Sequence, residues 1–516
     1  SPVAIAARTR HATPTPRQGE SIFDASVVLP CAYEYEYAAR TVRSVSAATP
    51  PEILREIVVV DDGSTPPLRI PEPARWKAFV VRLEKTGGLI RARIAGAAAA
   101  TGAVIVFFDC HVRPMDGYWR GLLAPIEADY RVATVPTVTR LDAATWQPVG
   151  SPTRGGAKCY LTFDTDFKWT FDATDDVPIM SGGLVAISRR WWNETGGYDS
   201  SMLGWGGENI DLSLRIWRCG GAIKAAKESY VAHMYREPGK PKTAARFRVP
   251  KGAPTRNRAT SARAHFGRLW AKTAAFPLFE AHRLAPPDTS NIERALASLR
   301  CQSFEWYLRR FAYIYRDAGV LPGSIFQLEG GGRTCLSSTT AEPVRGMGQA
   351  YPEALRALPC NATDPRQWWH ESNRNETGRC CSGLRLWNAE LCIQRAGRLQ
   401  LCTAEGTNAA QHVRLTAAGR LRFTRFDDVC LDRSGRPASC AAAGSFRRRG
   451  RHAPLEFTLL SAELQRSFAG QRHGDRRRTP RQRPAGSTRS GGGHLIRDAR
   501  LPAGTGREGV LRSVHQ

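Results

Sequence analysis

An uninterrupted apolar run, Val-Ile-Val-Phe-Phe at residues 104–108, ends abruptly in Asp109-Cys-His111. Such a run without polar alternation is typical of a strand that is covered on both faces, as in a parallel sheet. Ligands of open α/β sheets gather at the carboxyl ends of these strands, where Asp109 and His111 fall. The run therefore favours an α/β fold with a carboxylate and an imidazole available to a divalent cation, although a strand-end turn with a capped Asp would give the same pattern.

Short apolar strands alternate with helical stretches from Ser26 onward. We predict strands at 26–29, 57–60, 79–83 and 104–109, and helices at 36–47 and 89–100. This βαβ succession predicts a mostly parallel, doubly wound sheet. The second strand ends in Asp61-Asp62, which would either hold the base and ribose of a nucleotide or cap a helix. The first strand is followed by no Gly-x-Gly-x-x-Gly, which disfavours a dinucleotide.

A second group of motifs lies between residues 178 and 236. Paired glycines before an apolar strand allow the backbone to approach a ligand closely. The Gly-rich residues 204–207 predict a loop, followed by an amphipathic helix with Leu212, Ile216 and Cys219 on one side. His233 ends a short apolar stretch, and taken alone it is more typical of a surface or core histidine than of a ligand.

Length and composition add three expectations. A chain of 516 residues predicts two globular domains plus extensions. It begins at Ser1 without a signal-like stretch, so we expect a targeting or anchoring segment upstream. Nine of the 13 cysteines fall between Cys301 and Cys440, which favours disulfides and an oxidising compartment.

The formal net charge of +27 does not predict a nucleic-acid partner, because much of it lies at the C-terminus. Residues 446–516 carry sixteen Arg, five acidic residues and no Lys, a net charge of +11. This Gly, Pro and Arg-rich tail lacks hydrophobic periodicity beyond about Leu464, so we expect disorder, although an out-of-frame translation of a GC-rich gene has the same composition. It also lacks the interleaved aromatic residues that stack bases, so no nucleic acid is expected.

In chain order the motifs resemble one family, the polypeptide N-acetylgalactosaminyltransferases, which begin mucin-type O-glycosylation from UDP-GalNAc. The resemblance runs from about Ser26 to Tyr307. The motifs that carry it are Asp61-Asp62-x-Ser64, Asp109-x-His111, Met180-x-Gly-Gly-Leu184, Trp205-Gly-Gly-Glu-Asn209, Arg215-x-Trp-x-Cys-Gly-Gly221 and His233-x-x-Arg236.

The resemblance implies a Rossmann-like nucleotide-sugar glycosyltransferase domain of the A type, with a mostly parallel sheet, followed by a ricin-type β-trefoil lectin-like domain. The boundaries that we expect are an N-terminal arm at 1–22, the catalytic domain at 23–285, a linker at 286–325, the trefoil at 326–462 and the Arg-rich tail at 463–516.

The resemblance also implies the site. Mn²⁺ would be held by Asp109, His111 and His233 together with the UDP diphosphate. Glu208 would accept hydrogen bonds from sugar hydroxyls, Trp205 would line the leaving-group side, and Arg236 would close on the pyrophosphate at the start of a mobile lid over 237–243. The implied residues are, for catalysis, Trp205, Glu208 and Arg236; for substrate binding, Asp61, Asp62, Gly182, Gly183, Asn209 and Tyr235; and for the metal, Asp109, His111 and His233.

The implied function is a retaining, Mn²⁺-dependent transfer of N-acetylgalactosamine from UDP-GalNAc to Ser or Thr hydroxyls of a protein or glycopeptide acceptor. The implied location is the Golgi lumen, behind a type II membrane anchor. Two alternatives stay open: a transferase that uses another UDP-sugar, and a catalytically lapsed carbohydrate-binding homologue. An inverting sugar transferase is disfavoured because no general-base Asp is evident near the acceptor side.

The chain departs from the family pattern in three segments. Residues 29–35 replace a Phe-His-Asn-Glu element that contacts uridine, Lys85-Thr86 replace an arginine near the nucleotide, and residues 162–167 replace an Asp-Trp element that helps to bind the acceptor. A Lys side chain substitutes only loosely for the forked guanidinium. The identity of the sugar and the acceptor preference therefore stay open.

Cysteines give a further check on the resemblance. Cys219 and Cys301 match a family disulfide, whereas a second family pair is absent, with Glu228 at one expected position. The trefoil repeats would be closed by Cys335 with Cys360, Cys392 with Cys402, and Cys430 with Cys440, and Cys380 and Cys381 have no evident partners. The third repeat alone keeps the sugar-holding acid, Asp432, so a structural trefoil without a sugar site is an equal alternative.

Overall fold

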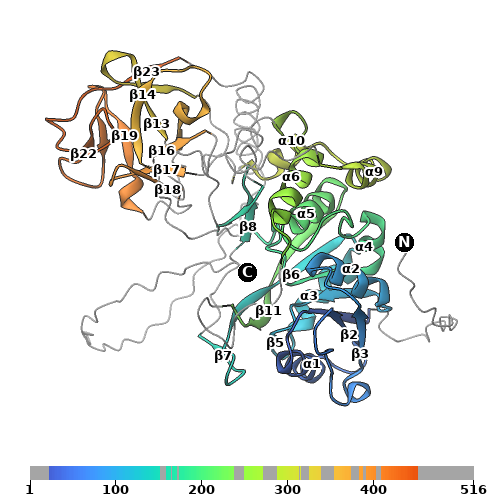
Figure 1. The fold of residues 1–516 in the computed structure, drawn as a ribbon. Coiled ribbons are helices and arrows are strands. Elements are labelled where there is room, and N and C mark those ends of the chain that lie inside the picture. The colour runs from blue at the N-terminus through green and yellow to red at the C-terminus, as the bar shows by residue number, and fades with distance from the viewer. Residues whose placement is uncertain are drawn as a thin grey trace, which may run out of the picture.

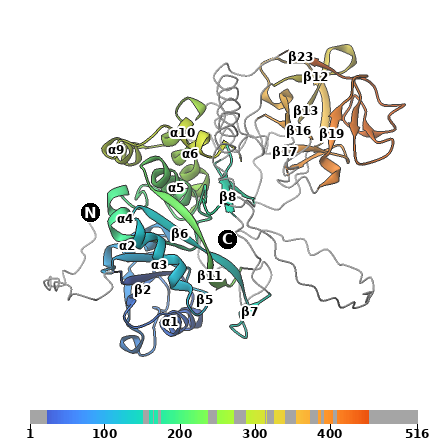
Figure 2. The ribbon, with the colours of Figure 1, turned by 180° about the vertical axis from the view of Figure 1, so that it is seen from behind.

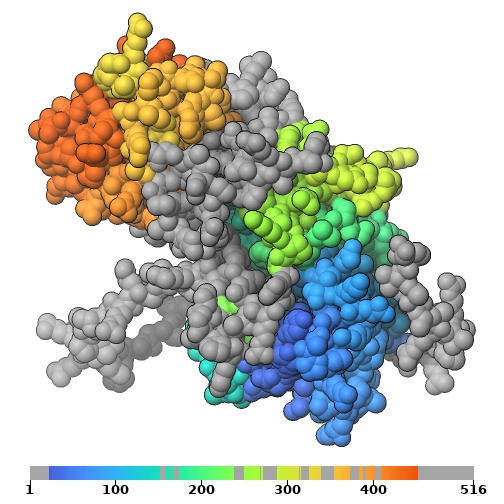
Figure 3. Space-filling model, viewed as in Figure 1, coloured from blue at the N-terminus to red at the C-terminus, as the bar shows by residue number. Residues whose placement is uncertain are grey.

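The computed structural model describes residues 23–150, 158–163, 165–170, 174–236, 249–270, 287–312, 314, 325–338, 354–372, 383–387, 391–402 and 408–450. In both ribbon views the yellow to orange C-terminal strands form a body separate from the blue to green α/β domain (Figures 1 and 2). The space-filling view shows the same two coloured bodies (Figure 3).

The α/β domain is built on a nine-stranded sheet in the order β3-β2-β1-β4-β10-β6-β11-β5, with β7 paired to β6. Strands β3, β2, β1 and β4 are mutually parallel, as are β6 and β11, whereas β10, β5 and β7 run antiparallel to their neighbours. The prediction of a mostly parallel α/β sheet is therefore confirmed. The strands are β1 (Ala25–Cys31), β2 (Leu54–Asp62), β3 (Ala78–Leu83), β4 (Val104–Phe107), β5 (Val112–Pro114), β6 (Val132–Leu141), β7 (Pro148–Val149), β10 (Val185–Ser188) and β11 (Ala222–His233), with β8 (Lys158–Leu161) and β9 (Phe167–Thr170) in a small separate sheet.

Helices cover both faces of the sheet. Along β1, Val27 and Leu29 enter the apolar core that contains residues of α1 and α3, while Val28 enters the core that contains residues of α2 and α5. This alternation follows from the period-2 geometry of a strand, and it explains why apolar runs without polar positions predict the central strands. The helices are α1 (Glu36–Ala48), α2 (Leu89–Ala99), α3 (Tyr118–Ala128), α4 (Arg189–Thr195), α5 (Glu208–Arg218), α6 (Ala253–His265), α9 (Ser290–Ser298) and α10 (Phe304–Arg310).

Helix α5 has the predicted amphipathic pattern, with Leu212 and Ile216 buried on its apolar side, and its polar side is buried as well. All eleven of its residues are buried. Its charged residues find partners inside the protein: Arg215 pairs with Asp211, and Nε2 of His265 donates to Oδ1 of Asp211 at 2.9 Å. Nη1 of Arg218 donates to Nδ1 of the same imidazole at 2.7 Å. Buried charges are tolerated when they are paired and hydrogen-bonded in this way, so the helix needs no solvent-exposed face.

This network predicts a loss of stability in mild acid. Burial is the main cause that lowers the pKa of His265 to about 4, from its ordinary value of 6.5. A depressed folded-state pKa means that the unfolded chain binds the proton more tightly, so stability is full above pH 6.5 and falls as the pH approaches 4. We expect urea unfolding at pH 5 to show up to about 2 kcal/mol less stability from this residue than at pH 7.

A His265→Gln variant is the control for that prediction. Gln keeps an acceptor for Arg218 and a donor for Asp211 but does not titrate, so its difference between pH 7 and pH 5 should be smaller by the same amount. An unchanged pH dependence in this variant would contradict the assignment.

The C-terminal domain contains three four-stranded sheets, as expected of a three-repeat β-trefoil. Strand β23 of the last segment returns to pair with β12 of the first, which closes the domain. Disulfides join Cys335 to Cys360, Cys392 to Cys402 and Cys430 to Cys440, one in each sheet region, as predicted. The strands are β12 (Gln327–Glu329), β13 (Thr334–Ser338), β14 (Leu355–Pro359), β15 (Trp369–Ser372), β16 (Gly383–Leu386), β17 (Leu391–Gln394), β18 (Arg398–Leu401), β19 (Val413–Leu415), β20 (Leu421–Phe423), β21 (Cys430–Leu431), β22 (Pro437–Ala438) and β23 (Arg447–Arg449).

The carboxylate of Asp432 is committed to a local turn. Its Oδ1 accepts hydrogen bonds from the backbone N–H of Ser434 and Arg436 at 2.8 and 2.9 Å, and from the Ser434 hydroxyl at 2.6 Å. A sugar contact by Asp432 stays a prediction. Cys380, Cys381 and the Arg-rich tail beyond residue 450 lie outside the described residues.

Among the described residues, no helix combines the length and apolar character that crossing a membrane requires.

Candidate metal and donor site

Three ligand-type side chains meet at the carboxyl edge of the sheet. Asp109 and His111 lie in the turn between β4 and β5, and His233 is the last residue of β11. Because β11 pairs with β5, His233 lies opposite Val112, next to that turn. The ligand atoms of the three residues all lie within 4.8 Å of one another, and no second such cluster occurs in the described ranges. The structure thus brings together the three residues that the sequence predicted.

The protonation states suit a cation. Nε2 of His233 donates to Oδ2 of Asp109 at 3.0 Å. Burial acts to raise the pKa of Asp109, but this hydrogen bond and the charge of Arg93 outweigh it and hold the pKa well below its usual range. Burial lowers the pKa of His233. An ionised carboxylate and a neutral imidazole are the forms that bind a divalent metal.

Arg93 supports this cluster and was missed by the sequence analysis. Its fully buried guanidinium donates to Oδ1 of Asp109 at 3.1 Å and to the carbonyl oxygen of Gly183 at 2.8 Å, and it also reaches the carbonyl of Gly182. The signal was present, because Arg93 falls on the buried side of α2 with Ile90 and Ala97. A charged residue in an apolar helical stripe predicts a buried partner.

The paired glycines lie against the cluster. A Cβ at Gly183 would lie 3.0 Å from Oδ2 of Asp109. Gly182 has a φ of 104°, and a Cβ there would approach the side chain of Asn209 to 3.1 Å. Nδ2 of Asn209 donates to the carbonyl of Met180 at 2.8 Å, which fixes the segment before β10. Any side chain at position 183 would crowd the carboxylate that we assign to the metal.

Glu208 begins α5 and is 1% exposed. Burial raises the pKa of its carboxyl, and the charge of Arg93 partly opposes this shift. Within the described part of the chain its Oε2 has no hydrogen-bond partner. Trp205, in the preceding loop, is half-buried, and its carbonyl accepts from Asn257 of α6 at 3.5 Å. Glu208 therefore has a buried acceptor atom to offer a hydroxyl donor.

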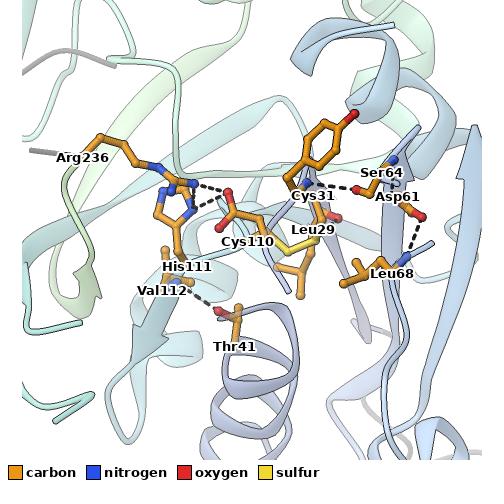
Figure 4. Close-up of a disulfide and its surroundings, with 12 residues drawn as sticks. Leu29, Cys31, Thr41, Asp61, Ser64, Leu68, Cys110, His111, Val112 and Arg236 are labelled. Atoms are coloured by element: carbon orange, nitrogen blue, oxygen red, sulfur yellow. Dashed lines mark hydrogen bonds and ion pairs between the residues drawn. A yellow bond between two sulfur atoms is a disulfide. The ribbon is translucent and has the colours of Figure 1, made fainter. Parts of the chain in front are cut away.

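Glu34, also missed from the sequence, connects the metal cluster to Arg236. Its carboxylate pairs with Arg236, and its Oε1 lies 3.3 Å from Nδ1 of His111. Nη2 of Arg236 lies 3.3 Å from the same nitrogen, and Figure 4 shows Arg236 beside His111. The ring of Tyr235 lies 4.8 Å from that of His233 and is 38% exposed. The lid expected at 237–243 lies outside the described residues.

Asp61 and Asp62 end β2 and are bonded within the protein. Asp61 accepts from the backbone of Ser64 and Leu68 at 3.0 and 2.9 Å and pairs with Arg82. Asp62 accepts from the N–H groups of Gly87 and Gly88 at 2.6 and 2.8 Å. Both residues therefore shape the loops at this edge, and a direct contact with uridine stays a prediction.

Two family models match the α/β domain. Residues 26–193 match the glycosyl transferase family 2, and residues 169–237 match the N-terminal domain of galactosyltransferase. Together the two matches contain all the metal-cluster residues.

Among curated proteins, the chain is 34% identical over 311 residues to polypeptide N-acetylgalactosaminyltransferase 11 of Xenopus tropicalis, covering 55% of this chain and 49% of that protein. It is 32% identical over 300 residues to the mouse enzyme numbered 4, covering 52% and 48%, and 30% identical over 417 residues to the Caenorhabditis elegans enzyme numbered 5, covering 74% and 61%. The chain spans about half the length of the first of these relatives.

A solved structure, GalNAc-T7 with UDP, GalNAc and Mn²⁺, shares the fold with a TM-score of 0.55 at 23% identity and covers 84% of this chain and 83% of its own. The shared fold, the family models and the curated relatives all indicate a glycosyltransferase domain. The chain is a homologue of the polypeptide N-acetylgalactosaminyltransferases.

Proposed function

We propose that this protein is a retaining glycosyltransferase that moves N-acetylgalactosamine from UDP-GalNAc to Ser or Thr hydroxyls of a protein or glycopeptide acceptor, with Mn²⁺ as cofactor. The observation that carries the proposal is the convergence of Asp109, His111 and His233 at the carboxyl edge of the sheet, within reach of Arg236. Nucleotide ligands of α/β sheets bind at this edge.

The three cluster residues suit Mn²⁺ both in their donor atoms and in their protonation states. Mixed carboxylate and imidazole donors suit this ion, and Asp109 is held ionised while His233 is held neutral. When bound, the cation would neutralise the charge that develops on the departing diphosphate.

The remaining residues have separate roles in the proposed reaction. Arg236 would neutralise charge on the pyrophosphate, once the donor competes for the guanidinium that Glu34 holds. Glu208 accepts a hydrogen bond from a sugar hydroxyl. Gly182 and Gly183 leave room for the sugar and diphosphate beside the backbone. The acceptor hydroxyl attacks from the face that UDP leaves, and a phosphate oxygen of UDP takes its proton.

The direct test is a transfer assay. The protein is incubated with Mn²⁺, a panel of UDP-sugars and Ser/Thr-rich peptides, and the products are read by mass spectrometry. We expect a HexNAc increment on peptide with UDP-GalNAc, and none after chelation of the metal. Absence of an increment for every sugar and peptide would reject the transferase function.

A carbohydrate-binding homologue without catalysis is the second candidate. The observation that favours it is that Asp61 and Asp62, the residues expected to hold the uridine, already accept hydrogen bonds from within the protein. Titration of UDP-GalNAc with and without Mn²⁺ separates the two candidates. Metal-dependent binding supports the transferase, whereas binding without metal, or no binding, supports the lapsed homologue.

We also propose a location in the Golgi lumen, which the family resemblance implies and which the disulfides in both domains support. The membrane anchor and a carbohydrate bound by the C-terminal domain are further parts of this proposal.

A further inference from the structure

A disulfide that the sequence did not predict lies inside the metal-binding turn. It joins Cys31, the last residue of β1, to Cys110, which stands between Asp109 and His111. The two Cα atoms are 5.3 Å apart, and both side chains are 1% exposed. Figure 4 shows it between His111 on one side and Asp61 with Ser64 on the other.

The disulfide continues a strand pairing where the backbone cannot. The ladder between β1 and β4 ends with Val28 opposite Phe107, and the N–H of Phe108 donates to the carbonyl of Val28 at 3.1 Å. Extended by three residues, the same register sets Cys31 opposite Cys110. The intervening residue Pro30 has no N–H to donate to the turn. The sulfur bridge thus takes the place of ladder hydrogen bonds at the position of the metal ligands.

The same bridge anchors the loop that carries Glu34. Tyr33 and Tyr35 have positive φ angles of 59° and 44°, a conformation that non-glycine residues adopt only when their surroundings impose it. The N–H of Tyr33 donates to the Ser64 hydroxyl at 2.9 Å, and Glu34 contacts His111. The loop after β1 and the turn after β4 are therefore held together by a covalent bond and by a carboxylate that touches a metal ligand.

We propose that the Cys31–Cys110 disulfide is a positioning crosslink, which holds Asp109 and His111 in the arrangement that binds Mn²⁺ and the donor diphosphate. This inference rests on the metal-dependent function proposed above. Its consequence is that the metal affinity of the folded protein depends on this one disulfide, and not on disulfides in general. Partners that orient ligands in this way commonly change metal affinity by about 10–100-fold when they are lost.

The chain supplies a matched control. Cys219 and Cys301 form a disulfide in the same domain that spans 82 residues, against 79 for Cys31 and Cys110. Loops of nearly equal length restrict the unfolded chain to nearly the same extent. Cys219 lies just before the start of β11 (Ala222–His233), whereas His233 is the last residue of that strand, so the control disulfide lies at the other end of β11 from the metal ligand. A purely stabilising role would make the two disulfides equivalent.

The experiment compares Cys31→Ala/Cys110→Ala with Cys219→Ala/Cys301→Ala. Alanine is chosen because Cys31 and Cys110 belong to an apolar core. Mn²⁺ binding is measured by electron paramagnetic resonance of the free ion, and folding by circular dichroism and urea unfolding. We expect both variants to lose similar stability, but only the Cys31/Cys110 variant to bind Mn²⁺ about tenfold more weakly. Equal Mn²⁺ affinity in that variant and the wild type, or an equal loss in both variants, would overturn the proposal.

A second measurement keeps the test open if the Cys31/Cys110 variant does not fold. Wild-type protein is reduced with a phosphine under native conditions and desalted, and the reduced pairs are identified by alkylation and mass spectrometry. Folded molecules with Cys31 and Cys110 reduced should show the same loss of Mn²⁺ affinity, and unchanged affinity would refute the crosslink. If the oxidised wild type itself bound no Mn²⁺, the proposed function would fail together with the inference; binding by the wild type with no effect of the disulfide would reject the inference alone.

Discussion

Replacing Asp109 with Asn is expected to lower metal-dependent transfer by about a thousandfold. The substitution removes an anionic metal ligand and leaves the charge of Arg93 beside His233 without its carboxylate. Loss of a ligand should exceed the about 10–100-fold effect that loss of a supporting partner has on metal affinity. If the metal supplies several kcal/mol of charge stabilisation, transfer should fall by about a thousandfold, equivalent to roughly 4 kcal/mol. Peptide glycosylation by mass spectrometry and Mn²⁺ binding by resonance check the two effects separately.

Two further variants decide how the Asp109 result is understood. Asp116→Asn removes the same charge from an exposed position seven residues later and should leave transfer and Mn²⁺ binding unchanged. His111→Ala removes a metal ligand that makes no contact with Arg93 among the described hydrogen bonds, and it should resemble Asp109→Asn. Normal Mn²⁺ binding by His111→Ala together with weak binding by Asp109→Asn would mean that Asp109 acts through Arg93 and not as a ligand.

The sequence predicted the sheet well because burial alone determines its central strands. Strands β1, β2, β3 and β4 lie where the apolar runs are. As expected, β10 follows the Gly-Gly pair, and β11 ends at His233. The predicted amphipathic helix is present at 208–218, but its pattern did not show that its polar side is buried as well. Polar residues at a helical spacing normally indicate a solvent face, but Asp211 and Arg218 both contact His265 of α6, a partner 54 residues from Asp211 along the chain.

Long-range pairing also explains which site residues were found. Asp109 and His111 are two residues apart in the chain and follow a buried strand, so the topology of the sheet indicates their place. His233 became interpretable only through the order of the motifs, because nothing within its own segment distinguishes a ligand from a core histidine. The pairing of β11 with β5 provides the physical reason that it joins the other two.

The residues that were missed act through partners that lie far from them along the chain. Glu34 lies in a segment where the family motif is altered, and its role depends on Arg236, about 200 residues away. Arg93 required knowledge that one side of α2 faces the Gly182-Gly183 backbone. Cys31 and Cys110 are separated by 79 residues and pair because β1 and β4 are neighbours in register. Each of these contacts depends on the order of the strands in the sheet, which the sequence pattern predicted only in part.

Glu208→Gln is expected to lower kcat/KM for transfer by about 100-fold, which is roughly 2.7 kcal/mol. In the wild type a buried carboxylate accepts the hydrogen bond from the sugar, whereas in the variant a neutral amide accepts it. The wild-type carboxyl is buried at the start of α5 under the influence of Arg93, and its Oε2 has no partner within the described residues. Mn²⁺ affinity should change little, since Glu208 does not belong to the ligand cluster. Glu228→Gln, at an exposed position of β11, is the matched control and should behave as the wild type.

The same variant tests the chemistry of retention. Double displacement needs a carboxylate beneath the anomeric carbon, and Glu208 is the nucleophile that the motifs offer for it. Front-face attack needs no protein nucleophile, so neither wild type nor Glu208→Gln should gain a HexNAc on the protein when incubated with UDP-GalNAc and Mn²⁺ without peptide. Intact-mass spectrometry of both proteins gives the answer. A glycosyl adduct on Glu208 of the wild type, or on a neighbouring side chain of the variant, would replace front-face attack with a covalent mechanism, because a retained adduct can arise only if a protein group attacks the anomeric carbon before the acceptor does.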